Sequence, residues 1–245
     1  MTPSTKKTKT TRVLAPAKLN LGLRVVGRRA DGYHLLESLF VPLDLTDRLS
    51  LCFGAIGPAS ENGEIEVEIE MSCDAALGTR SALPAPRENL AVRAARRFLE
   101  GAGLSGALSI RLEKSIPIGA GLGGGSSDAG AILRALDRHC PGAHSADRLL
   151  EIATGLGADV PFFLAPEPSV VRGIGEQISP LPGLPAAWLL LANPGVSLAT
   201  AEVFEIFDRS ALALTLARSR STMRSLDALG ADPRAAESLT KAFDS

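Results

Sequence analysis

The chain has 245 residues, a formal net charge of −1, 45% apolar and 4% aromatic side chains. This apolar content can fill a core, so the composition excludes a chain that is disordered throughout. The balanced charge offers no excess of basic residues for a phosphate backbone, and the few aromatic residues offer little surface for base stacking. The composition therefore does not indicate nucleic-acid binding. The length fits one large domain or two smaller ones.

The cysteines and the apolar runs indicate the compartment. Three widely spaced cysteines without a Cys-x-x-Cys pair predict reduced thiols and a cytoplasmic protein: Cys52, Cys73 and Cys140. The longest apolar run, residues 186–192, is far shorter than the roughly 20 residues that cross a bilayer, so we expect no membrane contact. Residues 1–12 are rich in Lys, Arg and Thr, and we expect a disordered basic tail there.

Alternating apolar and polar residues predict four strands. These strands cover residues 18–25, 47–53, 64–71 and 107–114. The third strand carries four glutamates on one face, which is typical of an antiparallel strand with one face in solvent. Paired carboxylates can also serve acid–base chemistry, but a regular row of four favours solubility.

Helical periodicity predicts the remaining elements. Helices are expected over residues 89–102, 124–139, 146–155 and 199–207, followed by weak helical patterns from residue 210. A short buried strand is expected over residues 188–192. Strands and helices mixed without a regular βαβ rhythm favour an α+β fold. A composition shift at residues 165–168 predicts two domains, 13–165 and 166–245.

A glycine-rich segment is the sharpest local signal. The sequence Pro117-Ile-Gly-Ala-Gly-Leu-Gly-Gly-Gly-Ser-Ser-Asp128 lies between a predicted strand and a predicted helix. Glycines permit positive φ and remove every Cβ, so successive amides can converge on an anion at the start of a helix. The serines that follow can cap the helix, contact phosphate or help hold Mg²⁺. We expect a phosphate-binding loop, and a flexible hinge is the plainer alternative.

Other phosphate-binding motifs fit this segment less well. The glycine spacing satisfies the dinucleotide fingerprint, which would make the protein a dinucleotide-dependent oxidoreductase. That fold needs a second strand after the helix, ending in an acidic residue, whereas another helix is predicted here. The chain has no Gly-Lys dipeptide, which excludes a Walker A loop, and it lacks the marks of protein kinases.

Phosphoryl transfer would also need a positioned hydroxyl, a group that assists its deprotonation, and cations. Asp159 lies in a predicted tight turn, Gly155-Leu-Gly-Ala-Asp-Val-Pro161. Lys18 shares a strand face with Asn20. Taken alone, the aspartate could be a turn or cap residue and the lysine an ordinary surface charge.

Four motifs together resemble the kinases of 4-diphosphocytidyl-2-C-methyl-D-erythritol, a family within the galactokinase, homoserine kinase, mevalonate kinase and phosphomevalonate kinase (GHMP) superfamily. They are the glycine loop, Ala15-Pro-Ala-Lys-Leu-Asn-Leu21, Arg29-Ala-Asp-Gly-Tyr-His34 and Gly157-Ala-Asp-Val-Pro161. The likeness runs in order from residue 15 to residue 207. It implies a two-domain α+β kinase that uses ATP and Mg²⁺ to phosphorylate the 2-hydroxyl of its substrate in the non-mevalonate isoprenoid pathway.

The resemblance also assigns roles to individual residues. It makes Asp159 the general base and Lys18 its electrostatic partner, a pairing that can stabilise a forming alkoxide. The residues that would bind the ATP phosphates or lie near the nucleotide are Gly119, Gly121, Gly123, Gly124, Gly125, Ser126, Ser127, Asn89 and Lys114.

The remaining assignments concern the substrate. Asn20 would orient it, and Tyr33 and His34 would hold the cytosine, with Phe204 on its other side. Tyr33 is the single tyrosine of the chain and follows a turn signal. The plainer alternatives are a packing role for the tyrosine and a structural role for the histidine.

One family feature is not found. The later glycine-rich segment of the family, which contacts the substrate diphosphate, has no counterpart after residue 210. We therefore expect an incomplete C-terminal domain with an unpaired sheet edge. The gene could be shortened, a partner chain could supply the surface, as in a homodimer, or the protein could be a catalytically impaired relative that only binds nucleotides or metabolites.

Overall fold

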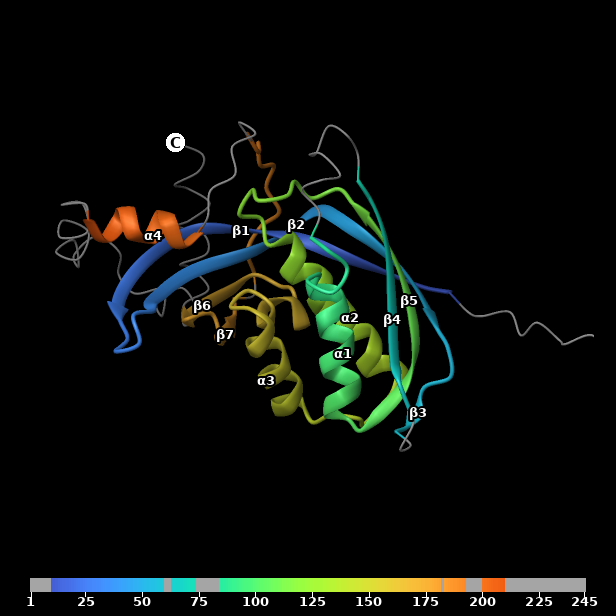
Figure 1. The fold of residues 1–245 in the computed structure, drawn as a ribbon. Helices are drawn as coiled ribbons and strands as arrows, with labels where there is room; N and C mark the ends of the chain where they lie inside the picture. Colours follow the sequence, from blue (N-terminus) through green and yellow to red (C-terminus); the bar gives the residue numbers. More distant parts are fainter. Residues whose placement is uncertain (1–9, 60–62, 74–83, 182, 193–199, 210–245) are drawn as a thin grey trace, which may run out of the picture. The chain divides into compact units, whose positions relative to one another are not determined.

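The computed structural model describes residues 10–59, 63–73, 84–181, 183–192 and 200–209 (Figure 1). The elements in chain order are β1 (Thr10–Arg28), β2 (His34–Phe53), β3 (Gly57–Pro58), β4 (Ile65–Cys73), α1 (Leu90–Gly101), β5 (Leu104–Lys114), α2 (Gly124–His139), α3 (Ala146–Leu156), the 3-10 helix η3 (Pro161–Leu164), β6 (Ser169–Gly173), β7 (Gln177–Pro180) and α4 (Thr200–Arg209). The mixture of strands and helices confirms the α+β class.

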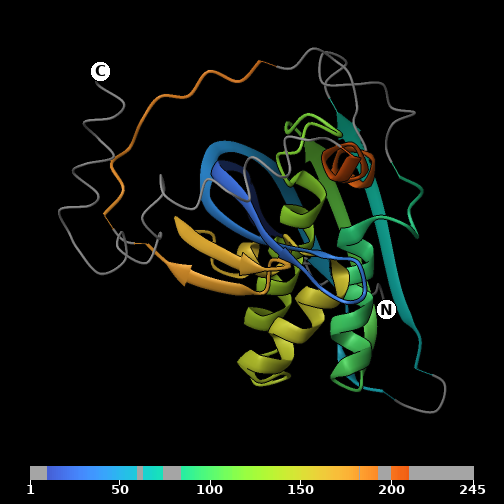
Figure 2. The same cartoon turned by 90° about the vertical axis from the view of Figure 1, so that its left-hand side faces the viewer.

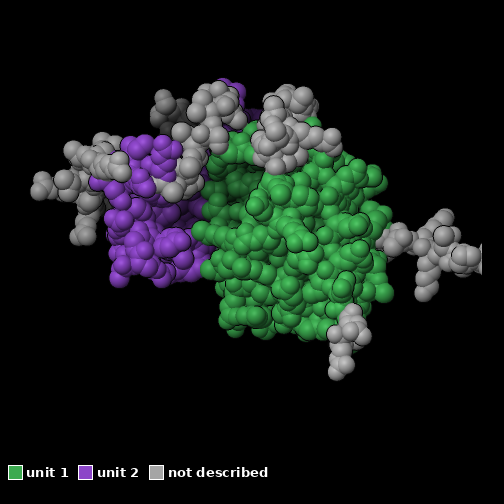
Figure 3. All heavy atoms as spheres, viewed as in Figure 1, with its two compact units in different colours: residues 1–18, 43–166 green, residues 19–42, 167–245 purple. Residues whose placement is uncertain are grey.

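The chain divides into two compact units, coloured separately in Figure 3. Unit 1 comprises residues 1–18 and 43–166, and unit 2 comprises residues 19–42 and 167–245. The long strands β1 and β2 contribute residues to both units. A division into two continuous segments, as expected from composition, could not anticipate this, because composition does not reveal where a strand leaves one unit and enters the other.

In unit 1, β5 is the central strand. It pairs antiparallel with the Arg48–Phe53 part of β2 and parallel with β4. The prediction of an antiparallel partner for β4 was wrong. The chain returns from β4 to β5 through α1, and a connection through a helix brings two strands side by side in parallel. The alternation in β4 is as predicted, with its glutamates exposed.

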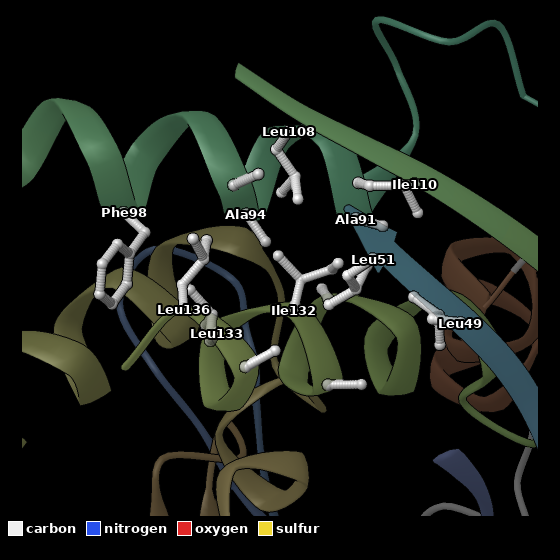
Figure 4. Close-up of a cluster of buried hydrophobic side chains, with 14 of the residues drawn as sticks. Leu49, Leu51, Ala91, Ala94, Phe98, Leu108, Ile110, Ile132, Leu133 and Leu136 are labelled. Carbon is white, nitrogen blue, oxygen red and sulfur yellow. The ribbon is translucent and has the colours of Figure 1, made fainter. Parts of the chain in front are cut away.

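The core of unit 1 lies between this sheet and the helices α1 and α2 (Figures 1 and 2). Figure 4 shows Phe98 of α1 and Ile132 of α2 among the apolar side chains of β2 and β5. Both side chains are fully buried. Burying a large apolar side chain contributes about 1.5–3 kcal/mol, so this shared core determines where α2 begins relative to β5.

In unit 2, the Leu36–Phe40 part of β2 pairs antiparallel with β6, and β6 pairs antiparallel with β7. A tight turn joins β1 to β2: the Arg29 amide donates to the Tyr33 carbonyl at 2.8 Å, and Gly32 adopts φ +93°. The strands β6 and β7 were not predicted, because each is too short to show a periodic pattern.

Residues 188–192 do not form the predicted buried strand. They are irregular, and Trp188 is fully exposed. Apolarity suggested a strand, but a strand also needs a hydrogen-bonded neighbour, and the described residues provide none for this segment.

Some elements predicted near the two ends of the chain lie outside the described residues. The expected basic tail lies there up to residue 9, while Thr10 already belongs to β1. The helix predicted over residues 199–207 is α4, and the weak helical patterns from residue 210 lie outside the described residues. No helix in the described part of the chain has the length and apolarity needed to span a bilayer.

Candidate active site

The glycine loop follows β5 and leads into α2. Gly119, Gly121 and Gly123 have φ values of +72°, +74° and +72°, a conformation that costs other residues free energy. Within the described structure, the amides of residues 119–123 donate to no backbone carbonyl. The first amides of α2 are also without intrahelical acceptors, so unpaired N–H groups gather at the start of this helix. The loop therefore has the donors that an anion requires.

Lys18 and Asp159 lie together beside this loop. The Lys18 ammonium is 3.3 Å from an Asp159 carboxylate oxygen, and the Lys18 amide donates to the Leu122 carbonyl at 2.9 Å. The lysine side chain is buried, while the aspartate side chain is 32% exposed. A Cβ on Gly123 would lie 3.0 Å from Lys18 Cγ, so this glycine lets the loop approach the lysine closely.

The position of Asp159 depends on η3, which begins two residues later. Phe163 of η3 packs against α2 at Gly130, where an added Cβ would lie 2.5 Å from the Phe163 Cβ. The Arg134 guanidinium of α2 donates to the Phe163 carbonyl. The Val160 amide donates to the Gly157 carbonyl at 3.1 Å, which forms the turn predicted around Asp159. These contacts hold η3, and with it the turn that carries Asp159, against the helix that starts at the glycine loop.

A buried ionic cluster joins the two ends of the glycine loop. The Lys114 ammonium at the end of β5 donates to carboxylates of Asp47 and Asp128, the latter at 2.8 Å. Asp47 also accepts from the amides of Ser115 and Ile116, at 2.6 and 2.9 Å. The cluster thus ties β2, the start of the loop and the first turns of α2 together.

Two carboxylates share one ammonium in this cluster, and burial makes their charge costly. Burial raises the pKa of Asp128 to about 7, against the lowering effect of Lys114. Burial lowers the pKa of Lys114, but Asp128 and Asp47 together outweigh it and leave that pKa raised. Asp128 Oδ1 is buried without a hydrogen-bond partner in the described structure, which suits a carboxyl that carries a proton near neutral pH.

Asn89 has a structural contact of its own. It is the N-cap of α1: its side-chain oxygen accepts from the Ala91 amide at 2.8 Å, and its side-chain nitrogen donates to Met71 Sδ at 3.1 Å. The two serines after the glycines differ. Ser126 is half-buried, whereas Ser127 is fully buried and its hydroxyl has no partner in the described structure.

The predicted substrate residues lie in unit 2. Asn20 of β1 donates to the Ser38 hydroxyl of β2 at 2.8 Å. The His34 ring stacks on Phe204 of α4, with centroids 4.7 Å apart and planes inclined by 15°. Tyr33 is 64% exposed, so its ring is not packed into the core. The structure therefore brings His34 and Phe204 together within unit 2, and Lys18, Asp159 and the glycine loop together within unit 1.

Two members of the buried cluster, Asp47 and Asp128, were not among the predicted site residues. Asp47 shares the alternating face of its strand with Leu49 and Leu51, and a carboxylate on an apolar face is a signal that could have identified it. Asp128 closes the glycine motif, and no local pattern marks it as buried. Among the described residues, no group of three or more His, Cys, Asp or Glu side chains could hold a metal ion.

Comparison with known proteins agrees with this arrangement. Residues 89–166, which contain the glycine loop, match the GHMP kinases N terminal domain. A crystal structure of a 4-(cytidine 5'-diphospho)-2C-methyl-D-erythritol kinase is 40% identical, with a TM-score of 0.58, and the match covers 80% of this chain and 63% of that one. A homoserine kinase from Cytophaga hutchinsonii, 21% identical, has the same fold, with a TM-score of 0.56 over 88% of this chain and 65% of the other. The fold is that of a GHMP kinase.

Three relatives identify the family more closely, and each is named 4-diphosphocytidyl-2-C-methyl-D-erythritol kinase. The relative from Paramagnetospirillum magneticum is 41% identical over 94% of this chain and 71% of its own length. Those from Syntrophotalea carbinolica and Polaromonas sp. are 42% and 45% identical, over 78% of this chain in both cases and 63% and 60% of their own lengths. The chain belongs to the 4-diphosphocytidyl-2-C-methyl-D-erythritol kinase family and spans 60–71% of these relatives.

The first prediction concerns the cap of α1. Asn89→Ala should lower the free energy of unfolding by about 1 kcal/mol, because the Ala91 amide loses its acceptor. Asn89→Asp keeps an acceptor and should restore most of this loss. Urea denaturation of the three proteins measures the difference. A loss in the alanine variant that the aspartate variant does not recover would contradict the capping role.

The second prediction concerns Asp128. Because its pKa of about 7 lies above the ordinary value of 3.8, the folded protein holds a proton that the unfolded chain releases between about pH 4 and pH 7. This carboxyl therefore lowers stability as the pH rises through that range. Asp128→Asn should remove the decline, whereas Asp137→Asn, on the same helix, should keep it. Urea denaturation from pH 5 to pH 8 tests this, and identical profiles for Asp128→Asn and the unmutated protein would refute it.

Proposed function

We propose that the protein transfers the γ-phosphoryl group of ATP to the 2-hydroxyl of 4-diphosphocytidyl-2-C-methyl-D-erythritol, a step in the non-mevalonate supply of isoprenoid precursors. The observation that carries the proposal is the contact of the Lys18–Asp159 pair with a loop of unpaired amides. Phosphoryl transfer needs an anion cradle and a group that assists the attacking hydroxyl in close proximity. Family membership supplies the substrate class.

In this proposal the glycine loop binds the phosphates of ATP. The amides of residues 119–125 and the dipole of α2 would stabilise the phosphate charge, together with the hydroxyls of Ser126 and Ser127. Mg²⁺ would neutralise charge on the phosphates. The Ser127 hydroxyl, which has no hydrogen-bond partner in the described structure, would be one of its oxygen ligands. Lys114 would lie near the nucleotide, since its ammonium is 3.2 Å from where a Cβ of Gly124 would stand. Family resemblance also puts Asn89 near the nucleotide.

Lys18 and Asp159 would assist the attacking hydroxyl. The Asp159 carboxylate would accept the hydroxyl proton as the oxygen bonds to the γ-phosphorus and the bond to ADP breaks. The Lys18 ammonium would stabilise the negative charge that develops on the attacking oxygen. The partial exposure of Asp159 suits a group that must reach a substrate, and the burial of Lys18 strengthens its electrostatic effect.

The residues of unit 2 would hold the substrate. Tyr33 offers an exposed ring on which cytosine can stack, and Phe204 would cover the other side of the base. His34 would hydrogen-bond to an edge of the base, and Asn20 would orient the methylerythritol. An amide and an imidazole both provide directional hydrogen bonds that suit this task.

The third prediction tests the catalytic pair. Asp159→Asn and Lys18→Met should each lower kcat by about 10²–10⁴-fold, the usual range for loss of a proton-transfer group. Both variants should bind ATP, because the glycine loop is unchanged. A coupled assay of ADP release with the cytidine-linked substrate measures turnover. The control is Asp147→Asn, a change at an exposed residue of α3. Unmutated protein that binds both substrates but releases no ADP would contradict the proposal.

The fourth prediction tests Tyr33. Tyr33→Ala should weaken binding of the cytidine-linked substrate by about 5–150-fold, corresponding to about 1–3 kcal/mol of stacking per base. ATP binding should not change, and Tyr33→Phe should retain the affinity because it keeps the ring. Isothermal titration with each ligand distinguishes the cases. Equal weakening of both ligands would remove Tyr33 from the cytosine site.

A further inference from the structure

One carboxylate, that of Asp208, has no role in the proposed reaction. Asp208 of α4 contacts two residues of the β1–β2 hairpin at once. One of its oxygens lies 2.8 Å from His34 Nε2, and the other lies 3.3 Å from the Arg28 guanidinium. The His34 side chain is only 11% exposed, so this hydrogen bond is largely shielded from water.

The hairpin holds both contacts in position. Arg28 Nε donates to the Gly32 carbonyl at 3.0 Å, which anchors the guanidinium to the turn. The His34 ring stacks on Phe204 and meets Phe207 edge-on, with centroids 6.3 Å apart. The two ring contacts and the hydrogen bond to Asp208 leave the imidazole little freedom to rotate. Asp208 therefore meets His34 in one orientation.

This arrangement determines which nitrogen of His34 carries the proton. A carboxylate oxygen can only accept a hydrogen bond, and the other oxygen of Asp208 pairs with the Arg28 cation. In the neutral imidazole the proton must then be on Nε2, and Nδ1 keeps a lone pair. In the described structure Nδ1 has no hydrogen-bond partner. His34 thus offers one acceptor for a ligand.

An acceptor at this point distinguishes two similar bases. Cytosine carries an exocyclic amine, which donates, where uracil carries a carbonyl oxygen, which accepts. We infer that Asp208 is a positioning residue that fixes the tautomer of His34, so that Nδ1 selects cytosine over uracil in the nucleotide part of the substrate. The inference rests on the proposed function in one respect only, that His34 meets the base. It adds a physical reason why the site would bind cytosine in preference to uracil.

Nucleotide binding tests the selection without requiring turnover. The unmutated protein should bind CDP at least about tenfold more tightly than UDP, because uracil would place a carbonyl oxygen against the His34 lone pair. Asp208→Ala should reduce this ratio towards one, and Asp208→Asn should reduce it in part, because an amide can either accept from Nε2 or donate to it. Glu202→Gln, on the exposed side of the same helix, should leave the ratio unchanged.

A structural role for Asp208 would give a different result. If Asp208 only stabilised α4, both variants would weaken CDP and UDP equally, and that outcome would overturn the inference. So would an unchanged ratio in a folded Asp208→Ala protein. Binding of ADP, which should remain as in the unmutated protein, and the thermal melting curve together confirm that each variant is folded.

Nitrogen NMR of the histidines measures the tautomer directly. The His34 signals, assigned by their loss in His34→Gln, should show a proton on Nε2 in the unmutated protein and a mixture in Asp208→Ala. A proton on Nδ1 in the unmutated protein would refute the inference even if the enzyme is active. Conversely, the Nε2 tautomer and a preference for CDP in a protein without kinase activity would support the inference and contradict the proposed function.

Discussion

The buried contact of Lys114 with Asp47 and Asp128 is the interaction on which the site depends. It joins a strand, the start of the glycine loop and the helix that follows the loop. A loop of glycines has no side chains with which to hold its own shape, and its conformational entropy opposes any single arrangement. The ionic cluster restrains the loop at both of its ends. It also costs desolvation free energy, which explains why the pKa of Asp128 is raised.

Close packing at two glycines also restrains the loop and its neighbours. Gly123 allows Lys18 and Phe163 to approach, and Gly130 allows the backbone of η3 to lie against α2. Each glycine is thus required by a neighbour, and Gly123 is also required by its positive φ. The loop, the lysine and the aspartate are consequently parts of one packed assembly. Rigid support of this kind keeps reacting groups in a fixed geometry, which is a main source of catalysis in phosphoryl transfer.

The sequence predicted most of unit 1 but little of unit 2. Strong periodicity identified α1, α2 and α3 within one or two residues, and the glycine spacing identified the loop. The pairing of Lys18 with Asp159 came from family resemblance, because 141 positions separate them and no local pattern encodes such a contact. The hairpin of β6 and β7, the parallel partner of β4 and the partners of Asp128 were missed, since each depends on tertiary pairing and not on local preference. The segment at residues 188–192 misled for the same reason.

Gly130 shows how the demands of a helix and of a site can conflict. Alanine forms helices more readily than glycine by about 1 kcal/mol, so a designer seeking thermal resistance would replace this residue in the middle of α2. The added methyl group would push against Cβ and the carbonyl of Phe163, and any relief would shift the chain that carries Asp159 four residues earlier. A gain in helix propensity would thus be transmitted to the aspartate. A poor helix former within α2 thus keeps the turn in place.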